Sequence, residues 1–493
     1  MGMDPRKLAL LPLLVTVACY STESVGISAG RDTDEPAAPV KAKFPSKIVG
    51  QVNESLTLAS PLAGDMDGDG LADFLVLADR TNQAGEYARP LLYLFYGKPG
   101  FPSELSTADA EAAFEVDSNF NGTVGDVNGD GYSDLLLAQY NAGNFVFGSK
   151  QRLHGIIERG TGGVMWTVGA LPAPFSLEQL VGLTFRPVGD VNGDGCADLI
   201  VSASATVDVT GGFANNAWVI PGHRGEWQPT AFDASGAIAN VGYGEPLYQV
   251  TLDPMESLLD LTPAGDVDGD SRDDLIAFNA NGSLMFYGNR QYPAELSVAA
   301  ADATLLPSPS ALRAVDSFFG KPSVQAGYLG DLDGDAKDDL ALMGRLDIFE
   351  IAYGQRWSGE SGPEPDLTIS TAPDKRIYQA AAGDVDGDGF AELLFNVVDV
   401  PPDETMPAFQ LSSSVYMLRG TGERLRGEVR LSENERWDPP VGKPDGESLY
   451  RLVLGGDIDG DGSQDILTTS TALGGLSENG PVYLIPSTPR APD

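Results

Sequence analysis

The chain has 493 residues and a formal net charge of −40, from 71 acidic and 31 basic side chains. This length is ample for a large hydrophobic core. The acidic excess argues against nucleic acid as a partner, because nucleic-acid binding needs a basic patch. The sequence has two histidines, His154 and His223, and neither lies in a recognisable motif. It therefore signals neither a His-rich metal site nor a Ser-His-Asp triad, and we find no other catalytic constellation in it.

The first predicted element is a targeting segment. Arg6 and Lys7 precede the apolar run 8–18, which is too short to span a bilayer but is typical of a signal peptide. Cys19 follows directly, and the sequence around it resembles a bacterial lipoprotein signal, which implies that Cys19 is lipidated. Ordinary signal cleavage and release is the alternative, since Thr16 stands where such signals usually have a leucine-like residue.

These features divide the start of the chain into two predicted parts. Residues 1–18 are the expected signal peptide, and residues 19–43, polar and proline-containing, are the expected flexible tether. Beyond Cys19 the sequence has one further cysteine, Cys196, so no internal disulfide bond is expected. We predict export to the bacterial cell envelope or the medium, with membrane contact only through a lipid on Cys19.

A short acidic loop then recurs seven times at intervals of 53 to 76 residues. Each copy reads Gly-Asp-x-Asp/Asn-Gly-Asp-x-x-x-Asp/Glu. Loops 1 to 7 begin at Asp65, Asp126, Asp190, Asp266, Asp331, Asp384 and Asp457. A motif that returns at a rough fixed period is the mark of a repeat architecture.

The loops have the spacing of calcium sites, because Ca²⁺ takes six to eight hard oxygen ligands and alternate residues of a tight loop can turn their oxygens inward. Positions one, three, five and nine offer side-chain oxygens, and position seven offers a backbone carbonyl. The predicted ligands are Asp65, Asp67, Asp69, Leu71, Asp73; Asp126, Asn128, Asp130, Tyr132, Asp134; Asp190, Asn192, Asp194, Cys196, Asp198; Asp266, Asp268, Asp270, Arg272, Asp274; Asp331, Asp333, Asp335, Lys337, Asp339; Asp384, Asp386, Asp388, Phe390, Glu392; and Asp457, Asp459, Asp461, Ser463, Asp465.

The varied residues at position seven fit a main-chain ligand, and the acid at position nine could close each site as a bidentate carboxylate. Up to seven structural calcium ions are expected, which would change the formal charge from −40 to about −26. Acidic turns that hold no metal are the alternative interpretation.

An EF-hand is the rival motif, but its loop needs a Glu at position twelve and flanking helices. Position twelve has no carboxylate in any copy: Val76, Leu137, Val201, Ala277, Leu342, Phe395 and Thr468. Short apolar runs such as 74–77 and 135–137 follow position nine instead, and such runs predict buried strands. Each loop is therefore expected to join two strands.

The copies differ in ways that should affect metal binding. Position six is Gly in five loops but Ser271 and Ala336 in loops 4 and 5. If this position needs a left-handed backbone, a non-Gly residue costs about 1–2 kcal/mol. Asn128 and Asn192 lower the charge of loops 2 and 3. We expect loops 1 and 7 to bind calcium best and loops 4 and 5 to bind it most weakly.

Each repeat can be laid out as four strands, which in the first repeat are 56–62, 74–77, 91–96 and 113–116. The third strand usually carries aromatics, as in 93–96, and these are expected to fill the core, although they could also line a ligand surface. Four-stranded sheets repeated around an axis make a β-propeller. Seven loops therefore predict an all-β, seven-bladed propeller over residues 44–487, followed by a tail at 488–493.

The two ends of the repeat region predict how the ring closes. The last repeat stops after its third strand, 482–485, and the first is preceded by a spare strand-like run, 47–52. Pairing of that run as the fourth strand of the last blade would close the ring and remove exposed sheet edges.

The seven in-phase loops resemble those of FG-GAP/VCBS repeat proteins, which include the integrin α-subunit propeller. The resemblance covers about residues 44–487 and implies a calcium-binding β-propeller. The Gly-Ala-Pro element that the family has after the second strand is missing here, where 77–79 read Leu-Ala-Asp and 201–203 read Val-Ser-Ala. The implication of integrin-like ligand recognition is correspondingly weaker than that of the fold.

The expected function is a calcium-stabilised binding or adhesion module at the cell surface, monomeric, for a protein or a glycan, with no catalytic residues. The longest connections, 202–263 and 397–454, are the candidate partner surface. A hydrolase or lyase acting on polysaccharide is the alternative, and it would need a carboxylate pair outside the loops; a purely structural envelope component is a third. One basic stretch, containing Arg419, Arg424, Arg426 and Arg430, is expected to form a solvated blade edge.

Overall fold

The structure is a computed structural model, and it describes most of the repeat region. The described residues are 46–486 except for 59–61, 83–84, 117–120, 140–141, 159–163, 171–179, 207–212, 226, 228–229, 234–247, 252–257, 280–281, 290–294, 298–300, 306–324, 346–347, 360–363, 400–412, 421–422, 433, 438–446 and 473–480. The predicted signal peptide, Cys19, the tether and the tail lie outside them. Among the described residues, no helix has the length and apolar character needed to cross a membrane.

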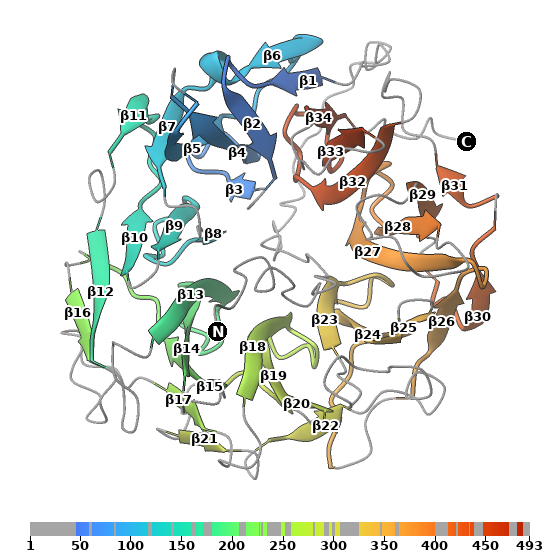
Figure 1. Cartoon of the computed structure of the whole chain (residues 1–493). Coiled ribbons are helices and arrows are strands. Elements are labelled where there is room, and N and C mark those ends of the chain that lie inside the picture. The colour runs from blue at the N-terminus through green and yellow to red at the C-terminus, as the bar shows by residue number, and fades with distance from the viewer. Residues whose placement is uncertain are drawn as a thin grey trace, which may run out of the picture.

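The described strands form seven sheets arranged around a central axis, which is the arrangement of a β-propeller (Figure 1). Sheet 1 contains β2 (Glu54–Thr57), β4 (Asp73–Thr81), β5 (Tyr87–Phe95) and β7 (Ala112–Glu115), with β3 (Leu62–Gly64) paired to β4. Sheet 2 contains β8 (Asn121–Gly125), β9 (Asp134–Gln139), β10 (Ala142–Val146) and β12 (Val164–Ala170). Sheet 3 contains β13 (Leu180–Gly189), β14 (Asp198–Thr206), β15 (Phe213–Ile220) and β17 (Tyr248–Thr251).

The remaining sheets repeat this order, with each loop leading into the second strand. Sheet 4 contains β18 (Leu258–Gly265), β19 (Asp274–Asn279), β20 (Gly282–Phe286) and β22 (Ala303–Leu305). Sheet 5 contains β23 (Gln325–Gly330), β24 (Asp339–Arg345), β25 (Ile348–Ala352) and β26 (Leu367–Ser370). Sheet 6 contains β27 (Lys375–Gly383), β28 (Glu392–Asp399), β29 (Ser413–Leu418) and β31 (Arg436–Trp437). Sheet 7 contains β32 (Glu447–Leu454), β33 (Ile466–Ala472), β34 (Val482–Ile485) and β1 (Ser46–Val49).

The ring closes by pairing the two ends of the repeat region. Strand β1 runs antiparallel to β34, with Lys47 opposite Tyr483 and Ile48 opposite Val482. Ile48 is fully buried because its side chain enters the core between sheets 7 and 1. The predicted closure by the run 47–52 is confirmed, with the strand itself occupying 46–49.

The hydrophobic cores lie between neighbouring sheets. One cluster joins Ile48 and Val482 of sheet 7 to Phe74 and Phe95 of sheet 1, and the two phenylalanine rings stack with centroids 5.0 Å apart. A central strand is therefore covered on both faces, and this explains why the second strand of each repeat reads as a continuous apolar run. The prediction that the third-strand aromatics fill the core is confirmed for the described sheets, as for Phe95, Phe286 and Phe349.

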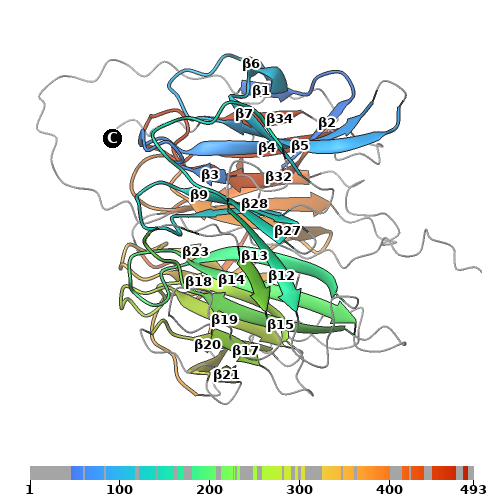
Figure 2. The ribbon, with the colours of Figure 1, turned by 90° about the vertical axis from the view of Figure 1, so that its left-hand side faces the viewer.

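A short fifth strand ties each of several sheets to the next, and the sequence did not predict it. These strands lie in the connection between the third and fourth strands of one sheet and pair in parallel with the outermost strand of the preceding sheet. They are β6 (Glu104–Ser106) on β1, β11 (Gly155–Ile157) on β7, β16 (Thr230–Asp233) on β12, β21 (Glu295–Ser297) on β17 and β30 (Gly427–Arg430) on β26. Both views show β6 beside β1 at the rim of the ring (Figure 1, Figure 2). They cover outer sheet edges that would otherwise be open to pairing.

The predicted all-β propeller is confirmed, and its blade count needs a correction. Six complete blades, one fewer than the predicted seven, take their four main strands from one continuous stretch of the chain; the seventh sheet is assembled from both ends of the repeat region. The predicted first strand of the first repeat, 56–62, is divided into β2 and β3. A 3-10 turn at Thr107–Asp109 was not predicted; it is capped by Ser106, whose side chain accepts the N–H of Ala108.

Candidate metal centre: the acidic loops

Position one of each acidic loop organises the turn through its carboxylate. Asp65 accepts hydrogen bonds from the backbone N–H groups of Gly68 (2.7 Å), Asp69 (3.1 Å) and Gly70 (2.9 Å). The same pattern recurs around Asp266, Asp331, Asp384 and Asp457. The acid at position one thus curls the chain around itself and fixes the direction of positions three to six.

Position nine connects the loop to the sheet. The side chain of Asp73 is fully buried; one carboxylate oxygen accepts the N–H of Met66 (2.9 Å) and the other accepts the N–H of Gly97, at the end of the third strand (2.8 Å). Asp134, Asp198, Asp274 and Asp339 make the equivalent pairs of bonds. The predicted bidentate ligand is therefore held rigidly; in Asp73 each oxygen keeps a further lone pair, whereas in Asp198 each oxygen accepts a second hydrogen bond from Asn192.

The structure brings three of the predicted ligand positions together in five loops. In loops 1, 4, 5, 6 and 7, oxygens from positions one, three and nine all lie within 4.8 Å of one another. Loops 2 and 3 have Asn at position three, and within the described chain they are not among these groups of acidic residues. Position five is outside the groups as well: in loop 1, one oxygen of Asp69 accepts the N–H of Leu71 (2.9 Å).

Burial makes the position-nine acids expensive to ionise unless a cation compensates them. Desolvation raises the pKa of Asp73, Asp134, Asp274 and Asp339 to about 8, and that of Glu392 to about 7. Nearby acids in the same loop raise these pKa values further, while hydrogen bonds from backbone N–H groups oppose the shift. A divalent cation would favour the charged forms.

Loop 6 provides a direct test of whether the residues fit a cation. Oxygen Oδ1 of Asp386 and oxygen Oε1 of Glu392 are buried, and neither has a hydrogen-bond partner among the described residues. A buried carboxylate oxygen without a partner is costly. Both residues belong to the group formed with Asp384, so hard oxygen donors converge on one point, as calcium requires. The residues of the loops fit the expected metal.

The backbone of the loops is left-handed at two positions. At position six, Ser271 has φ 66° and Ala336 has φ 65°, in agreement with the prediction that this position needs a left-handed residue. The Gly at position four also has positive φ in all seven loops, as Gly68 does at 72°. This position carries a second constraint, because a Cβ at Gly68 would lie 2.4 Å from the Tyr132 ring of loop 2.

The side chain at position seven also makes contacts between neighbouring loops. It covers the position-four glycine of the preceding loop, as Tyr132 covers Gly68, Cys196 covers Gly129 and Leu71 covers Gly460. The variation at position seven reflects side-chain contacts that differ from one sheet junction to the next. The role of its carbonyl as a ligand stays a prediction.

Backbone hydrogen bonds join the loops around the axis. The N–H of position eight donates to the carbonyl of position one in the preceding loop; for example, Ser133 donates to Asp65 (2.9 Å) and Ala197 donates to Asp126 (2.8 Å). Equivalent bonds join loops 3 and 4, 4 and 5, and 6 and 7. Ala72 donates to Asp457 (2.8 Å), so loop 1 is bonded to loop 7 across the closure. A change in one loop is therefore felt at its neighbour.

The arginines of the basic stretch of sheet 6 are exposed, as the sequence predicted, and three of the four also pair with acids. Arg419 pairs with Asp386 (2.7 Å), Arg426 pairs with Asp366 (2.6 Å), and Arg424 pairs with two acids of loop 5. Arg152 and Arg356 make similar contacts with loops 1 and 4. One sequence feature could have indicated these contacts. Arg152, Arg356 and Arg424 each lie two or four residues after the glycine that ends a third strand.

The two histidines lie in connections between strands. His154 is exposed, and the ring of His223 stacks on Trp227 with centroids 4.6 Å apart. The predicted partner surface at 202–263 and 397–454 falls largely outside the described residues, which omit 234–247, 400–412 and 438–446 among others. It stays a prediction.

Residues 187–220, which contain loop 3, match the FG-GAP repeat family. Together with the ring of sheets, this match confirms the resemblance to FG-GAP repeat proteins that the loops indicated. No curated protein matches the chain.

Several solved structures show a distant likeness in fold. An Agrocybe aegerita lectin that recognises non-reducing terminal N-acetylglucosamine is 14% identical, with 90% of this chain and 94% of the lectin covered and a TM-score of 0.37. BBS1N in complex with ARL6DN is 9% identical, with 88% of this chain and 96% of the BBS1N chain covered and a TM-score of 0.39. The V. cholerae biofilm matrix protein Bap1 is 13% identical, with 87% and 56% covered and a TM-score of 0.17. At these TM-scores the likenesses carry no argument about function.

Proposed function

We propose that the chain is a calcium-stabilised, non-enzymatic binding module that acts outside the cytoplasm. The observation that carries this proposal is the set of five converging acidic groups, in loops that backbone hydrogen bonds join around the axis. An ordered ring of anionic loops at one end of every sheet is a stability device that depends on a cation.

Calcium would be held mainly by positions one, three and nine, with Asp65, Asp67 and Asp73 as the set in loop 1. Its chemical contribution is charge: it compensates buried carboxylates whose ionisation is otherwise disfavoured. Millimolar calcium outside the cytoplasm suits weak sites of this kind. This supports export, with the segment 1–18 as signal peptide and Cys19 as the lipidated residue.

The partner is a protein or a glycan, bound on the loops of the propeller while the sheets act as a rigid support. The connections 202–263 and 397–454 are the proposed contact surface. The described residues give no specific support to polysaccharide cleavage, since the converging acids belong to the loops.

A glycan array and an array of purified envelope proteins, each probed with the labelled protein in 2 mM calcium and then in EDTA at about the same ionic strength, test this function. The proposal expects binding to one class in calcium that is reduced in EDTA. The variant Asp65→Ala should weaken binding, whereas Asp109→Ala, in a distant 3-10 turn, should leave it unchanged. Turnover of a polysaccharide panel, or binding that is indifferent to calcium, would contradict the proposal.

A further inference from the structure

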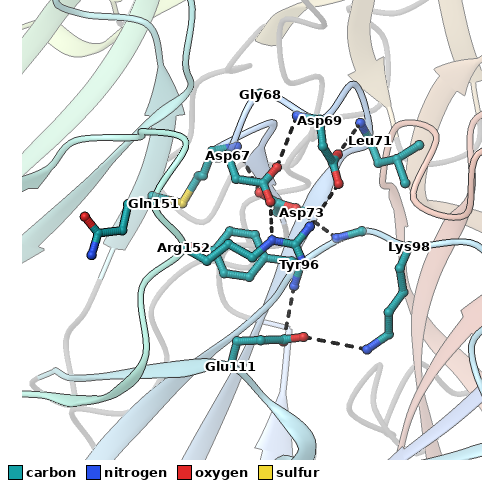
Figure 3. Close-up of polar contacts among 12 residues, drawn as sticks. Asp67, Gly68, Asp69, Leu71, Asp73, Tyr96, Lys98, Glu111, Gln151 and Arg152 are labelled. Atoms are coloured by element: carbon teal, nitrogen blue, oxygen red, sulfur yellow. Dashed lines mark hydrogen bonds and ion pairs between the residues drawn. The ribbon is translucent and has the colours of Figure 1, made fainter.

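Arg152 links two blades at loop 1. It belongs to the connection after the third strand of sheet 2, but its guanidinium pairs with Asp67 and with Asp69 (2.9 Å), at positions three and five of loop 1. The same guanidinium lies 4.7 Å above the ring of Tyr96, at the end of the third strand of sheet 1. Figure 3 shows Arg152 between the Tyr96 ring and the two carboxylates.

The backbone next to Arg152 is fixed to the same tyrosine. The N–H of Leu153 donates to the Tyr96 hydroxyl (2.8 Å), so the chain cannot shift without disturbing the stacked ring. The side chain of Asp67 is only 4% exposed, whereas Arg152 is 35% exposed. Removing an arginine from a buried acid costs more than breaking a pair of exposed ions, whose median contribution is small, because the buried charge is left without compensation.

The arrangement occurs twice more, at loops 4 and 5. Arg356 of sheet 5 pairs with Asp268 and lies 4.5 Å above the Tyr287 ring; the hydroxyl of Tyr287 donates to the carbonyl of the next residue, Trp357 (3.2 Å).

At loop 5, Arg424 of sheet 6 pairs with Asp333 and Asp335 (2.5 Å) and lies 5.1 Å above the Tyr353 ring. The hydroxyl of Tyr353 donates to the carbonyl of Leu425 (3.0 Å). Three junctions thus share the same contacts. In each, an arginine stacks on a tyrosine ring and pairs with a buried acid at position three, and the tyrosine hydroxyl is hydrogen-bonded to the backbone of the residue after the arginine.

The contacts occupy groups that the metal also needs. In loop 1, the two oxygens of Asp69 accept hydrogen bonds from Leu71 and from Arg152, so position five is already satisfied. One oxygen of Asp67 is bound to Arg152 as well. The positive charge of the arginine is therefore placed against the same carboxylates that would attract a cation, and like charges at this distance repel.

Resting on the calcium binding proposed above, we propose that Arg152, Arg356 and Arg424 are built-in counter-cations for loops 1, 4 and 5. Each holds its loop and the next blade together without metal, and each lowers the calcium affinity of the loop that it covers. Loop 7 provides the contrast: the single basic residue in 97–116, which follow the third strand of the adjoining sheet, is Lys98, and its ammonium pairs with Glu111 (3.6 Å), while Pro99 lies over Gly460. Loop 1 therefore binds calcium more weakly than its sequence alone indicates, and loop 7 becomes the strongest site.

The test compares Arg152→Gln with Arg89→Gln, a matched loss of one charge at a pair with Glu115 that is distant from the loops. In EDTA, Arg152→Gln is expected to lower the melting temperature by about 3–5 °C, because it strands a buried acid. Its calcium affinity at loop 1 is expected to rise roughly tenfold, since one charge about 5 Å from a divalent ion is removed. Arg89→Gln should change neither quantity by a comparable amount.

Placing the same change in an Asp65→Ala background assigns the affinity gain to loop 1, since the gain should then disappear. Arg152→Lys keeps the charge and should stay near wild-type calcium affinity. A purely structural arginine would lower stability and affinity together, so a fall in calcium affinity for Arg152→Gln would overturn the proposal, as would an unchanged melt in EDTA. The melting temperature in EDTA does not depend on calcium binding. A wild-type protein that binds no calcium would refute the proposed function and the claim that Arg152 lowers calcium affinity. The claim that Arg152 stabilises the metal-free loop would then be decided by the melting temperature in EDTA.

Discussion

Truncation of Ile48 tests the closure of the ring. Ile48 is fully buried in the core shared by sheets 7 and 1, where it packs in the cluster with Phe74, Val453 and Val482. Removing three carbons from a buried isoleucine costs about 2–5 kcal/mol, and the enclosed position favours the upper half of that range. For a cooperative unit of roughly 440 residues, whose unfolding entropy is about 0.9 kcal/mol/K, a loss of 3–4 kcal/mol lowers the melting temperature by about 3–4 °C.

The assay is thermal unfolding followed by circular dichroism and scanning calorimetry. Ile48→Ala is compared with Val52→Ala, which removes part of a side chain that is 89% exposed and should leave the melt within about 0.5 °C. Deletion of residues 44–52 should have a larger effect than Ile48→Ala, because the whole pairing with β34 is lost. Equal melting temperatures for Ile48→Ala and Val52→Ala would refute the closure, since a strand that carries the ring cannot be truncated without cost.

Three further predictions concern the loops. Ala336→Gly should stabilise the protein by about 0.5–1 kcal/mol, because relief of left-handed strain at φ 65° exceeds the entropic cost of glycine. Gly389→Ala introduces a Cβ that would meet no atom within 4 Å, and it should destabilise the protein by a similar amount. Urea unfolding in EDTA measures both variants, and stabilities equal to that of the wild type would contradict the strain. Asp457→Ala should remove more calcium affinity in titration calorimetry than Asp331→Ala, because loop 5 carries both Ala336 and the covering Arg424; the reverse order would exclude this ranking. Burial raises the folded-state pKa of Asp73, Asp134 and Asp339 to about 8. Their contribution to stability is therefore complete below pH about 4 and is lost as the pH rises to 8. Metal-free protein should melt at a higher temperature at pH 5 than at pH 8, and calcium should reduce the difference.

The periodic features of the sequence predicted the periodic features of the structure. Each acidic loop precedes a buried strand, each third strand ends near a glycine, and the run before the first repeat pairs with the last. The need for a left-handed residue at position six was also readable, because glycine occupies five of seven copies and Ser271 and Ala336 adopt positive φ.

Contacts between repeats were not readable in this way. Arg152 and Asp67 are 85 residues apart in the chain and meet only because sheets 1 and 2 are neighbours. Tyr132 and Gly68 meet for the same reason. Within a single repeat, position seven varies without evident pattern, since its partner lies in another repeat. The parallel fifth strands are only three or four residues long, too short to give a periodic signal.

Calcium binding by the whole protein, measured by equilibrium dialysis together with the melting temperature in calcium and in EDTA, tests the central claim most directly. The account predicts several calcium ions bound per chain at millimolar concentration and a higher melting temperature when they are bound. No bound calcium at that concentration, with the same melting temperature in EDTA, would contradict it.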